Sequence, residues 1–247
     1  MPPPIVLIAG LGLLAFIGCF IYALIRASAD HEQQRAVLLE TFCNRHGFTF
    51  ASRVDGRHDL RSKIRSFNCI GEARNPVVQA ALHTDPSGRF YLFDQMKISS
   101  TSSGGFYTIC LAEQDRPFAV PDLVITEVEN RLAAGISRAV PGSRGFAPVL
   151  TGESSFDNRF VVFAADPDRA VNALCPEVRR LLLAQAAVIR ARIVLQVQGN
   201  RLVVHNSGQG LRTLDSVEEL AALFHLTHQL ARQWVSRPGS PSGQQSP

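Results

Sequence analysis

Seven histidines and several paired carboxylates are the residues of this chain whose types suit chemistry. His225 and His228 stand three residues apart, a spacing that would put two metal ligands on one side of a helix. No H-E-x-x-H pattern contains them, no acidic partner lies nearby in the sequence, and a predicted apolar stripe on the same helix includes neither. We therefore interpret them as a solvent-facing pair, and we predict no metal ion and no cofactor.

Patterns that mark known catalytic or phosphate-binding loops do not occur in the sequence. It contains no G-x-x-x-x-G-K-[ST] or G-x-G-x-x-G loop and no G-x-S-x-G elbow. The carboxylate pairs Asp166/Asp168 and Glu218/Glu219 begin predicted helices, where negative charge complements the helix dipole. The sequence thus favours a non-enzymatic protein and leaves a hydrolase with a non-standard site as the alternative.

The five cysteines give no support for a disulfide framework or a structural metal. Their number is odd and no two of them form a C-x-x-C pair, the spacing of zinc and thioredoxin-like sites. Lone thiols on apolar stretches are typical of small core residues and suit a reducing cytoplasm. The formal charge of +4, from 25 basic and 21 acidic residues, is weak evidence for nucleic acid, which we do not expect as a partner.

A basic segment, Arg53–Arg65, is the candidate for direct contact with lipid headgroups. Four arginines recur at every fourth position, so a helix would align them on one side: Arg53, Arg57, Arg61 and Arg65. Each cation near an anionic membrane contributes about 1 kcal/mol of attraction. Gly56 weakens the helix and two aspartates dilute the charge, so a solvated loop is the competing interpretation and the one we favour.

The beginning of the chain has the character of a membrane anchor. Ile5–Ile25 holds 21 consecutive residues without a charge. As a helix with a rise of about 1.5 Å per residue it would reach roughly 31 Å, close to the hydrocarbon thickness of a bilayer. We therefore predict that residues 1–26 are a single-pass transmembrane anchor, with the lipid bilayer as its partner.

Two other signals compete with this reading of the apolar segment. A cleaved signal peptide has a basic start and a shorter apolar run, and here Arg26 interrupts the cleavage region. A lipoprotein signal would turn polar after Cys19, where this sequence stays apolar. Arg26, Arg35 and Arg45 follow the span and no Lys or Arg precedes it, so the positive-inside rule places the N-terminus outside and the rest of the chain in the cytoplasm.

Small residues recur at every fourth position within the span, at Ala15, Cys19 and Ala23. Such a face lets two transmembrane helices approach closely and would support a homo-oligomer. Transmembrane helices are rich in small residues in general, so the pattern suits an unpaired helix as well.

The chain after the anchor divides into three further parts. Helix formers and an apolar stripe predict a juxtamembrane helical stalk over residues 27–47, continuous with the span or separated from it by a short break, and Gly47 ends it. A soluble domain covers residues 48–236, and a Ser/Pro/Gln tail at 237–247 is predicted to be disordered. Residues 141–158, rich in Pro, Gly and Ser, form either an internal boundary or a long surface loop.

The soluble domain is predicted to be α+β, an antiparallel β-sheet with helices packed on one face. Alternation and turn residues predict strands at 48–52, 77–84, 89–98, 106–114, 123–126, 159–165, 192–198 and 201–205. Gly199-Asn200 suits a type II′ turn between the last two strands. Capping residues and prolines predict helices over 127–140, from Pro167, from Pro176 to about 189, and from Asp215.

Three stretches resemble an uncharacterised family of membrane-anchored bacterial proteins built around a domain of unknown function. The stretches are LLETFCNRHGFTF, GGFYTICLAEQDRPFAVPDLVI and FDNRFVVFAADPDRAVNALCPEVRRLLL. The last, Phe156–Leu183, is the most distinctive, with a Phe-x₃-Phe strand, an Asp-Pro helix start and a second helix that begins at a proline. The resemblance implies the anchor and the α+β fold, and it implies no catalytic residue.

These observations predict a membrane-tethered, non-enzymatic interaction or scaffold domain, single-pass in the bacterial inner membrane, with its soluble part in the cytoplasm. Its partners would be other proteins at the membrane. A membrane-associated hydrolase and an anionic-lipid-headgroup-binding domain remain as the alternatives.

Overall fold

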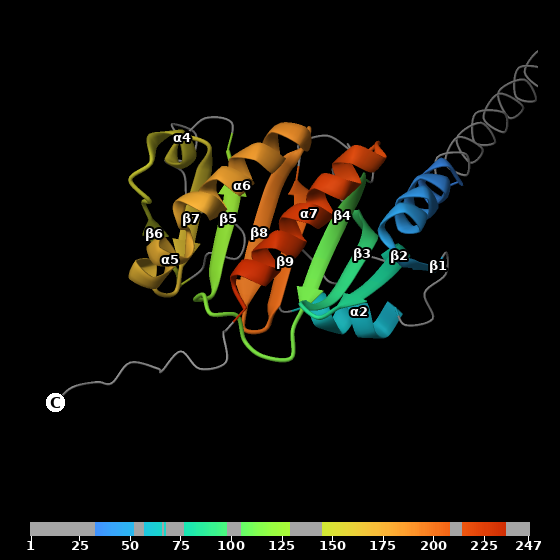
Figure 1. Cartoon of the computed structure of the whole chain (residues 1–247), viewed down its shortest axis with the longest axis horizontal. Coiled ribbons are helices and arrows are strands. Elements are labelled where there is room, and N and C mark those ends of the chain that lie inside the picture. The colour runs from blue at the N-terminus through green and yellow to red at the C-terminus, as the bar shows by residue number, and fades with distance from the viewer. Residues whose placement is uncertain are drawn as a thin grey trace, which may run out of the picture.

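The computed structural model describes residues 33–51, 57–65, 67, 77–97, 105–128, 145–207 and 214–235. Within these ranges one sheet of nine strands runs through the domain, and each strand pairs antiparallel with its neighbours (Figure 1). The strand order is β1 (Thr49–Ala51), β2 (Val77–Asp85), β3 (Gly88–Lys97), β4 (Gly105–Glu113), β9 (Arg201–Ser207), β8 (Arg192–Gln198), β5 (Leu123–Glu127), β7 (Phe160–Ala164) and β6 (Ala147–Val149). The predicted α+β class with an antiparallel sheet is confirmed.

Alternating apolar residues and turn chemistry explain most of these strands. The β8–β9 turn has a positive φ of 58° at Gly199, and no described non-glycine residue has a positive φ. That combination fits the type II′ turn, in which only the first central residue needs the left-handed region. The hairpin that Gly199-Asn200 predicts is therefore present, with Gln198 paired to Arg201.

One face of the sheet carries most of the helices (Figure 1). These are the helix at residues 33–46, α4 (Ser154–Asp157), α5 (Pro167–Ala173), α6 (Pro176–Val188) and α7 (Val217–Gln233). Their apolar side chains and the strand residues that face them form the larger hydrophobic core. Asp166 caps α5 by accepting a hydrogen bond from the Arg169 N–H, and a proline begins both α5 and α6, as the sequence predicts.

The opposite face carries α2 (Arg57–Ile64), and here the prediction of helices on one face only is wrong. Neighbouring strand residues point to opposite faces. Leu92 belongs to the larger core and Phe93 to a second one, in which Leu60, Ile64 and Phe67 pack on β3, β4 and β9. The loop that we favoured for the basic segment is also wrong for residues 57–64, because this apolar face stabilises a helix there.

Residues 141–158 contribute to the same sheet where they are described. Ala147–Val149 forms β6, which pairs with β7, and Ser154–Asp157 forms the short helix α4. The sequence concealed both elements because Pro, Gly and Ser dominate the segment. The tail at 237–247 lies outside the described residues, as does the predicted helix at 127–140 after residue 128. At Glu127 the helix prediction is wrong, because this residue ends strand β5.

Helix α7 begins one residue later than its sequence predicts. Ser216 is the N-cap, and its hydroxyl accepts a hydrogen bond from the Glu219 N–H at 3.1 Å. The Glu219 carboxylate in turn accepts from the N–H groups of Asp215 and Arg190. Glu219 is 5% exposed, so it closes the helix start and also ties it to the end of α6. The predicted cap at Asp215 is therefore wrong by one position.

The helix at residues 33–46 is part of the domain core. Leu39, Phe42 and Cys43 are each 1% exposed or less, and Gly47, with φ of 69°, ends the helix. Arg35 lies buried near the start of this helix. Its guanidinium donates to both carboxylate oxygens of Asp94 at 2.6 and 2.9 Å, to Thr108 Oγ1 at 2.8 Å, and to the Leu214 carbonyl.

Within the described ranges no helix has the length and apolar character needed to cross a bilayer. The predicted anchor at Ile5–Ile25, with Ala15, Cys19 and Ala23, lies outside those ranges.

We predict that Arg35→Met lowers the free energy of unfolding by about 3–5 kcal/mol, because it leaves the Asp94 carboxylate buried without its cation. Urea unfolding of the detergent-solubilised full chain measures the change. Arg45→Met, an exposed arginine on the same helix, is the matched control and should change it by less than about 0.5 kcal/mol. Equal effects of the two substitutions would contradict the docking of this helix on the sheet.

Candidate functional site

The basic segment is only partly described. Arg53 and the side chains of Arg57 and Arg61 lie outside the description, and Arg65 is exposed just after α2. The next polar feature of α2 is Lys63, whose Nζ lies 2.5 Å from Glu113 Oε2. Glu113 pairs with Arg89 across the sheet, whereas Arg35 binds Asp94, five residues further along β3. At about 3.4 Å per residue, the Lys63–Glu113 contact therefore lies some 17 Å along the strands from the level of Arg35, although Leu60 and Ile64 of α2 pack in the same cluster as Phe93.

Glu113 binds three cations. Beside Lys63, Arg201 Nε lies 3.1 Å from Oε1 and Arg89 Nη2 lies 3.5 Å from Oε2. Burial by itself would raise the pKa of Glu113, but the hydrogen bonds and charges of Lys63 and Arg201 outweigh it and lower that pKa below its ordinary value. The cluster fastens α2 to the sheet, and its carboxylate has no remaining oxygen for a substrate.

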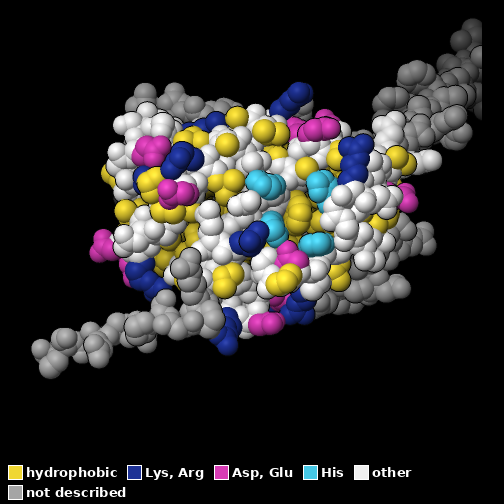
Figure 2. All heavy atoms as spheres, viewed as in Figure 1, with side chains coloured by type: hydrophobic (Ala, Val, Ile, Leu, Met, Phe, Trp, Pro, Cys, Tyr) yellow, Lys and Arg dark blue, Asp and Glu magenta, His cyan; other side chains and the backbone are white. Residues whose placement is uncertain are grey.

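Several histidines gather on the face that carries α7 (Figure 2). Histidine and phenylalanine rings surround Phe224 there. Phe48, Phe90 and Phe42 lie with their ring centroids 4.8, 5.7 and 6.2 Å from the Phe224 ring. Three histidine rings complete the set at 5.5–6.3 Å: His46, His83 and His228. His46 stacks on Phe42, and both burial and Arg45 lower its pKa, so it is neutral at pH 7.

Asp85 lies at the edge of this aromatic cluster, in the turn between β2 and β3. Its Oδ1 accepts from the backbone N–H of Ser87 at 2.7 Å and from the Ser87 hydroxyl at 2.5 Å. Its Oδ2 lies 2.7 Å from His228 Nε2 and 3.8 Å from His83 Nε2. Burial opposes ionisation of Asp85, but the bonds from Ser87 and His228 prevail and lower its pKa.

This arrangement fixes the proton of His228. Asp85 is a carboxylate at neutral pH and can only accept, so His228 must donate from Nε2. A neutral His228 therefore carries its proton on Nε2 and has a lone pair on Nδ1. Among the described residues, none forms a hydrogen bond with that nitrogen. The interpretation of His225 and His228 as a solvent-facing pair is thus wrong for His228, which is 21% exposed at its side chain and has a carboxylate partner.

A pocket of about 820 Å³ opens beside the pair. Asp85, Pro86 and Ser87 line it from the turn, and His228 and Arg232 line it from one face of α7. Arg232 makes no hydrogen bond or ion pair within the described part of the chain. The volume is in the range of small-molecule sites.

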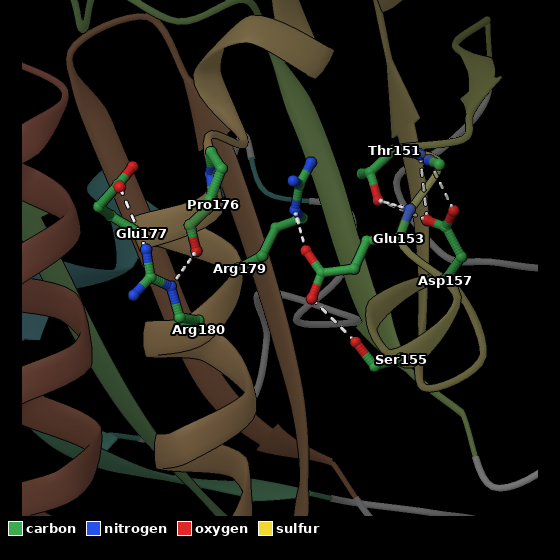
Figure 3. Close-up of polar contacts among 9 residues, drawn as sticks. Thr151, Glu153, Ser155, Asp157, Pro176, Glu177, Arg179 and Arg180 are labelled. Atoms are coloured by element: carbon green, nitrogen blue, oxygen red, sulfur yellow. Dashed lines mark hydrogen bonds and ion pairs between the residues drawn. The ribbon is translucent and has the colours of Figure 1, made fainter.

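The polar residues around α4 serve the local structure instead (Figure 3). Asp157 accepts from the backbone N–H groups of Thr151 and Gly152 and from the Thr151 hydroxyl. Glu153 accepts from Arg179 Nε at 2.6 Å and so joins α4 to α6. These contacts lie in and beside Phe156–Leu183, and they give Asp157 and Glu153 structural roles.

The described cysteines do not form a reactive site. Cys43, Cys110 and Cys175 are free thiols. Burial, with a smaller contribution from Glu40, raises the pKa of Cys43 to about 11, and burial raises that of Cys110 to about 12. Both therefore stay protonated at neutral pH. Among the described residues, no group of three or more His, Cys, Asp or Glu side chains is arranged to hold a metal ion.

Comparison of the whole chain with family models, with curated proteins and with solved structures gave no significant match.

The sequence did not reveal the Asp85–His228 pair or the Arg35–Asp94 pair. The partners of the first lie 143 residues apart and those of the second 59 residues apart. In the sequence, Asp85 is explained by the turn that it forms with Ser87, and His228 is explained as a polar residue of a helix. The fold brings the two together through the strand order β2–β3–β4–β9, on which α7 packs.

The lowered pKa of Glu113 gives a stability prediction with a definite sign. The carboxylate is stabilised in the folded state, so its contribution is present above the unfolded pKa and is lost as the pH falls through the folded one. Glu113→Gln should cost about 3 kcal/mol of unfolding free energy at pH 7, because Lys63 stays buried, and should flatten the fall of stability below about pH 4. Asp115→Asn, at a side chain that is 99% exposed, is the control in urea unfolding across that range. A cost at pH 7 no larger than that of the control would contradict the role of Glu113.

Proposed function

We propose that this chain is a membrane-tethered interaction domain, held by a transmembrane helix at Ile5–Ile25 with its soluble part on the cytoplasmic side. The observation that carries the proposal is the buried Arg35–Asp94 pair. It fastens the helix at residues 33–46 to β3, and Arg35, the first buried residue that the structure describes, lies ten residues after the end of the apolar run at Ile25.

That short connection limits where the domain can act. The ten steps from Ile25 to Arg35 span at most about 36 Å even when fully extended. The domain would therefore stay in a thin layer beside the bilayer, where its effective concentration toward other membrane-associated proteins is high. The free thiols of the described cysteines agree with a reducing compartment.

A membrane-associated hydrolase is the second candidate, because the Asp85–His228 pair has the geometry of an oriented general base beside a pocket. Turnover of simple carboxylic or phosphate esters by the solubilised full chain, lost in His228→Asn, would establish it. Headgroup binding by Arg53–Arg65 receives less support, because Arg65 is the only one of its four arginines whose side chain is described.

We predict that the double substitution Leu13→Arg and Leu14→Arg releases the full chain from the membrane pellet. Each arginine near the centre of a transmembrane helix costs about 2.5–3.5 kcal/mol on insertion. Sedimentation after an alkaline wash measures retention. The double variant Leu82→Arg and Leu150→Arg, at side chains exposed in the domain, should stay in the pellet.

A wild-type chain that leaves the membrane on washing would contradict the tether. Affinity capture from membranes then tests the interaction. We expect the wild type to capture proteins that the released variant does not capture. If both capture the same proteins, the proposal of a partner that depends on the tether loses its support.

A further inference from the structure

We propose that the pocket between the β2–β3 turn and α7 binds a small soluble anion that carries hydroxyl groups, such as a sugar phosphate or a hydroxycarboxylate. This inference rests on the proposed function, for which it names a ligand class, and it concerns Asp85, Ser87, His228 and Arg232.

The acceptor oxygens of Asp85 are already satisfied from inside the fold. Ser87 supplies two donors to Oδ1, and His228 supplies one to Oδ2. The Asp85 carboxylate lines the wall of the pocket, but the donors on both of its oxygens reduce its repulsion of an anionic ligand. Asp85 acts mainly as a positioning residue that holds the His228 ring.

Arg232 supplies the cation. It lies one helical turn beyond His228 on the same face of α7, with Cβ atoms about 6 Å apart at that spacing. Its guanidinium has no partner within the described residues and lines the same pocket, so it is available for bidentate binding of phosphate or carboxylate. Gln229 and Gln233 add amide groups to the wall.

His228 selects for a hydroxyl. Because the Nε2–H group donates a hydrogen bond to Asp85, the Nε2–H tautomer of His228 has a lone pair at Nδ1, and no described residue binds that nitrogen. A bare anion oxygen would repel that lone pair, whereas a hydroxyl donates to it. A ligand with an anionic group for Arg232 and a hydroxyl several ångströms away satisfies both side chains.

A second opening lies beside the same turn, and both basic and acidic side chains line it. It measures about 410 Å³ and shares Asp85, Pro86 and Ser87 with the first. Arg116 lines it without a partner among the described residues, and Arg89 lines it while paired to Glu113 and, at 3.9 Å, to Asp115.

The position of the pocket favours a soluble ligand over a lipid headgroup. Asp85 and Ser87 lie at the turn that leads into Arg89, about 17 Å along β3 from the level of Asp94 and Arg35. Arg35 marks the helix that leads back to the predicted anchor. The pocket thus opens toward the end of the sheet away from that side.

Calorimetric titration of the detergent-solubilised full chain with glucose 6-phosphate, glycerol 3-phosphate or citrate tests the proposal. We expect saturable binding of at least one of them at millimolar concentration or below, weaker binding of inorganic phosphate, and none of glucose. Arg232→Gln should weaken the binding about tenfold or more, since it removes a charge-assisted contact. Arg180→Gln, at an exposed arginine of α6 outside the pocket, should leave it unchanged.

Absence of saturable binding for all three probes, or equal effects of Arg232→Gln and Arg180→Gln, would overturn the proposal.

Nanodiscs separate the two sources of a phosphorylated hydroxyl compound. The free ligand should bind equally well to the chain in phosphatidylcholine and in phosphatidylglycerol discs. Loss of binding in the phosphatidylglycerol discs would mean that the lipid headgroup occupies the pocket, and it would overturn the proposal of a soluble ligand. Membrane retention does not depend on Arg232. A failure of anion binding would therefore not count against the membrane tether, which the sedimentation experiment tests by itself.

Discussion

The buried pair between Arg35 and Asp94 is the interaction on which the arrangement of the domain depends. It joins the first described helix to β3, and through Thr108 and Asn206 it reaches β4 and β9 in the middle of the sheet. Buried ion pairs contribute little to stability relative to apolar contacts, but an unmatched partner costs several kcal/mol. The pair therefore acts chiefly to fix one docking position for the helix that leads back to the apolar N-terminal run.

Two faces of the same sheet use charge in different ways. On one face, Glu113 gathers Lys63 and Arg201 and holds α2 against β4 and β9. On the other, Asp85 holds His228 toward a pocket, and His83 links the same region to the Gly47 carbonyl at the end of the first helix. Phe224 packs against His46 and His228, so one aromatic cluster connects the wall of the pocket with the C-terminal end of the first described helix.

Local patterns were sufficient for most elements and insufficient for the site. The β8–β9 hairpin, the Asp166 cap and the end of the first helix at Gly47 each follow from a few adjacent residues, and each is present. Helix α2 and strand β6 were missed because their stability comes from packing on distant strands that outweighs glycine, proline and charge in the segment. The pairing of Asp85 with His228 depends on strand order, which neither turn chemistry nor helical periodicity encodes.

The ends of the described sheet are short. β1 and β6 each contain three residues, and Pro148 in β6 has no N–H to offer a further strand. A long exposed edge strand can pair with the edge of a neighbouring copy and so cause aggregation. This risk grows when molecules are concentrated at a membrane surface. The proposed tether would crowd such domains along a bilayer, and with these short edges they would meet other molecules through side chains rather than through the backbone.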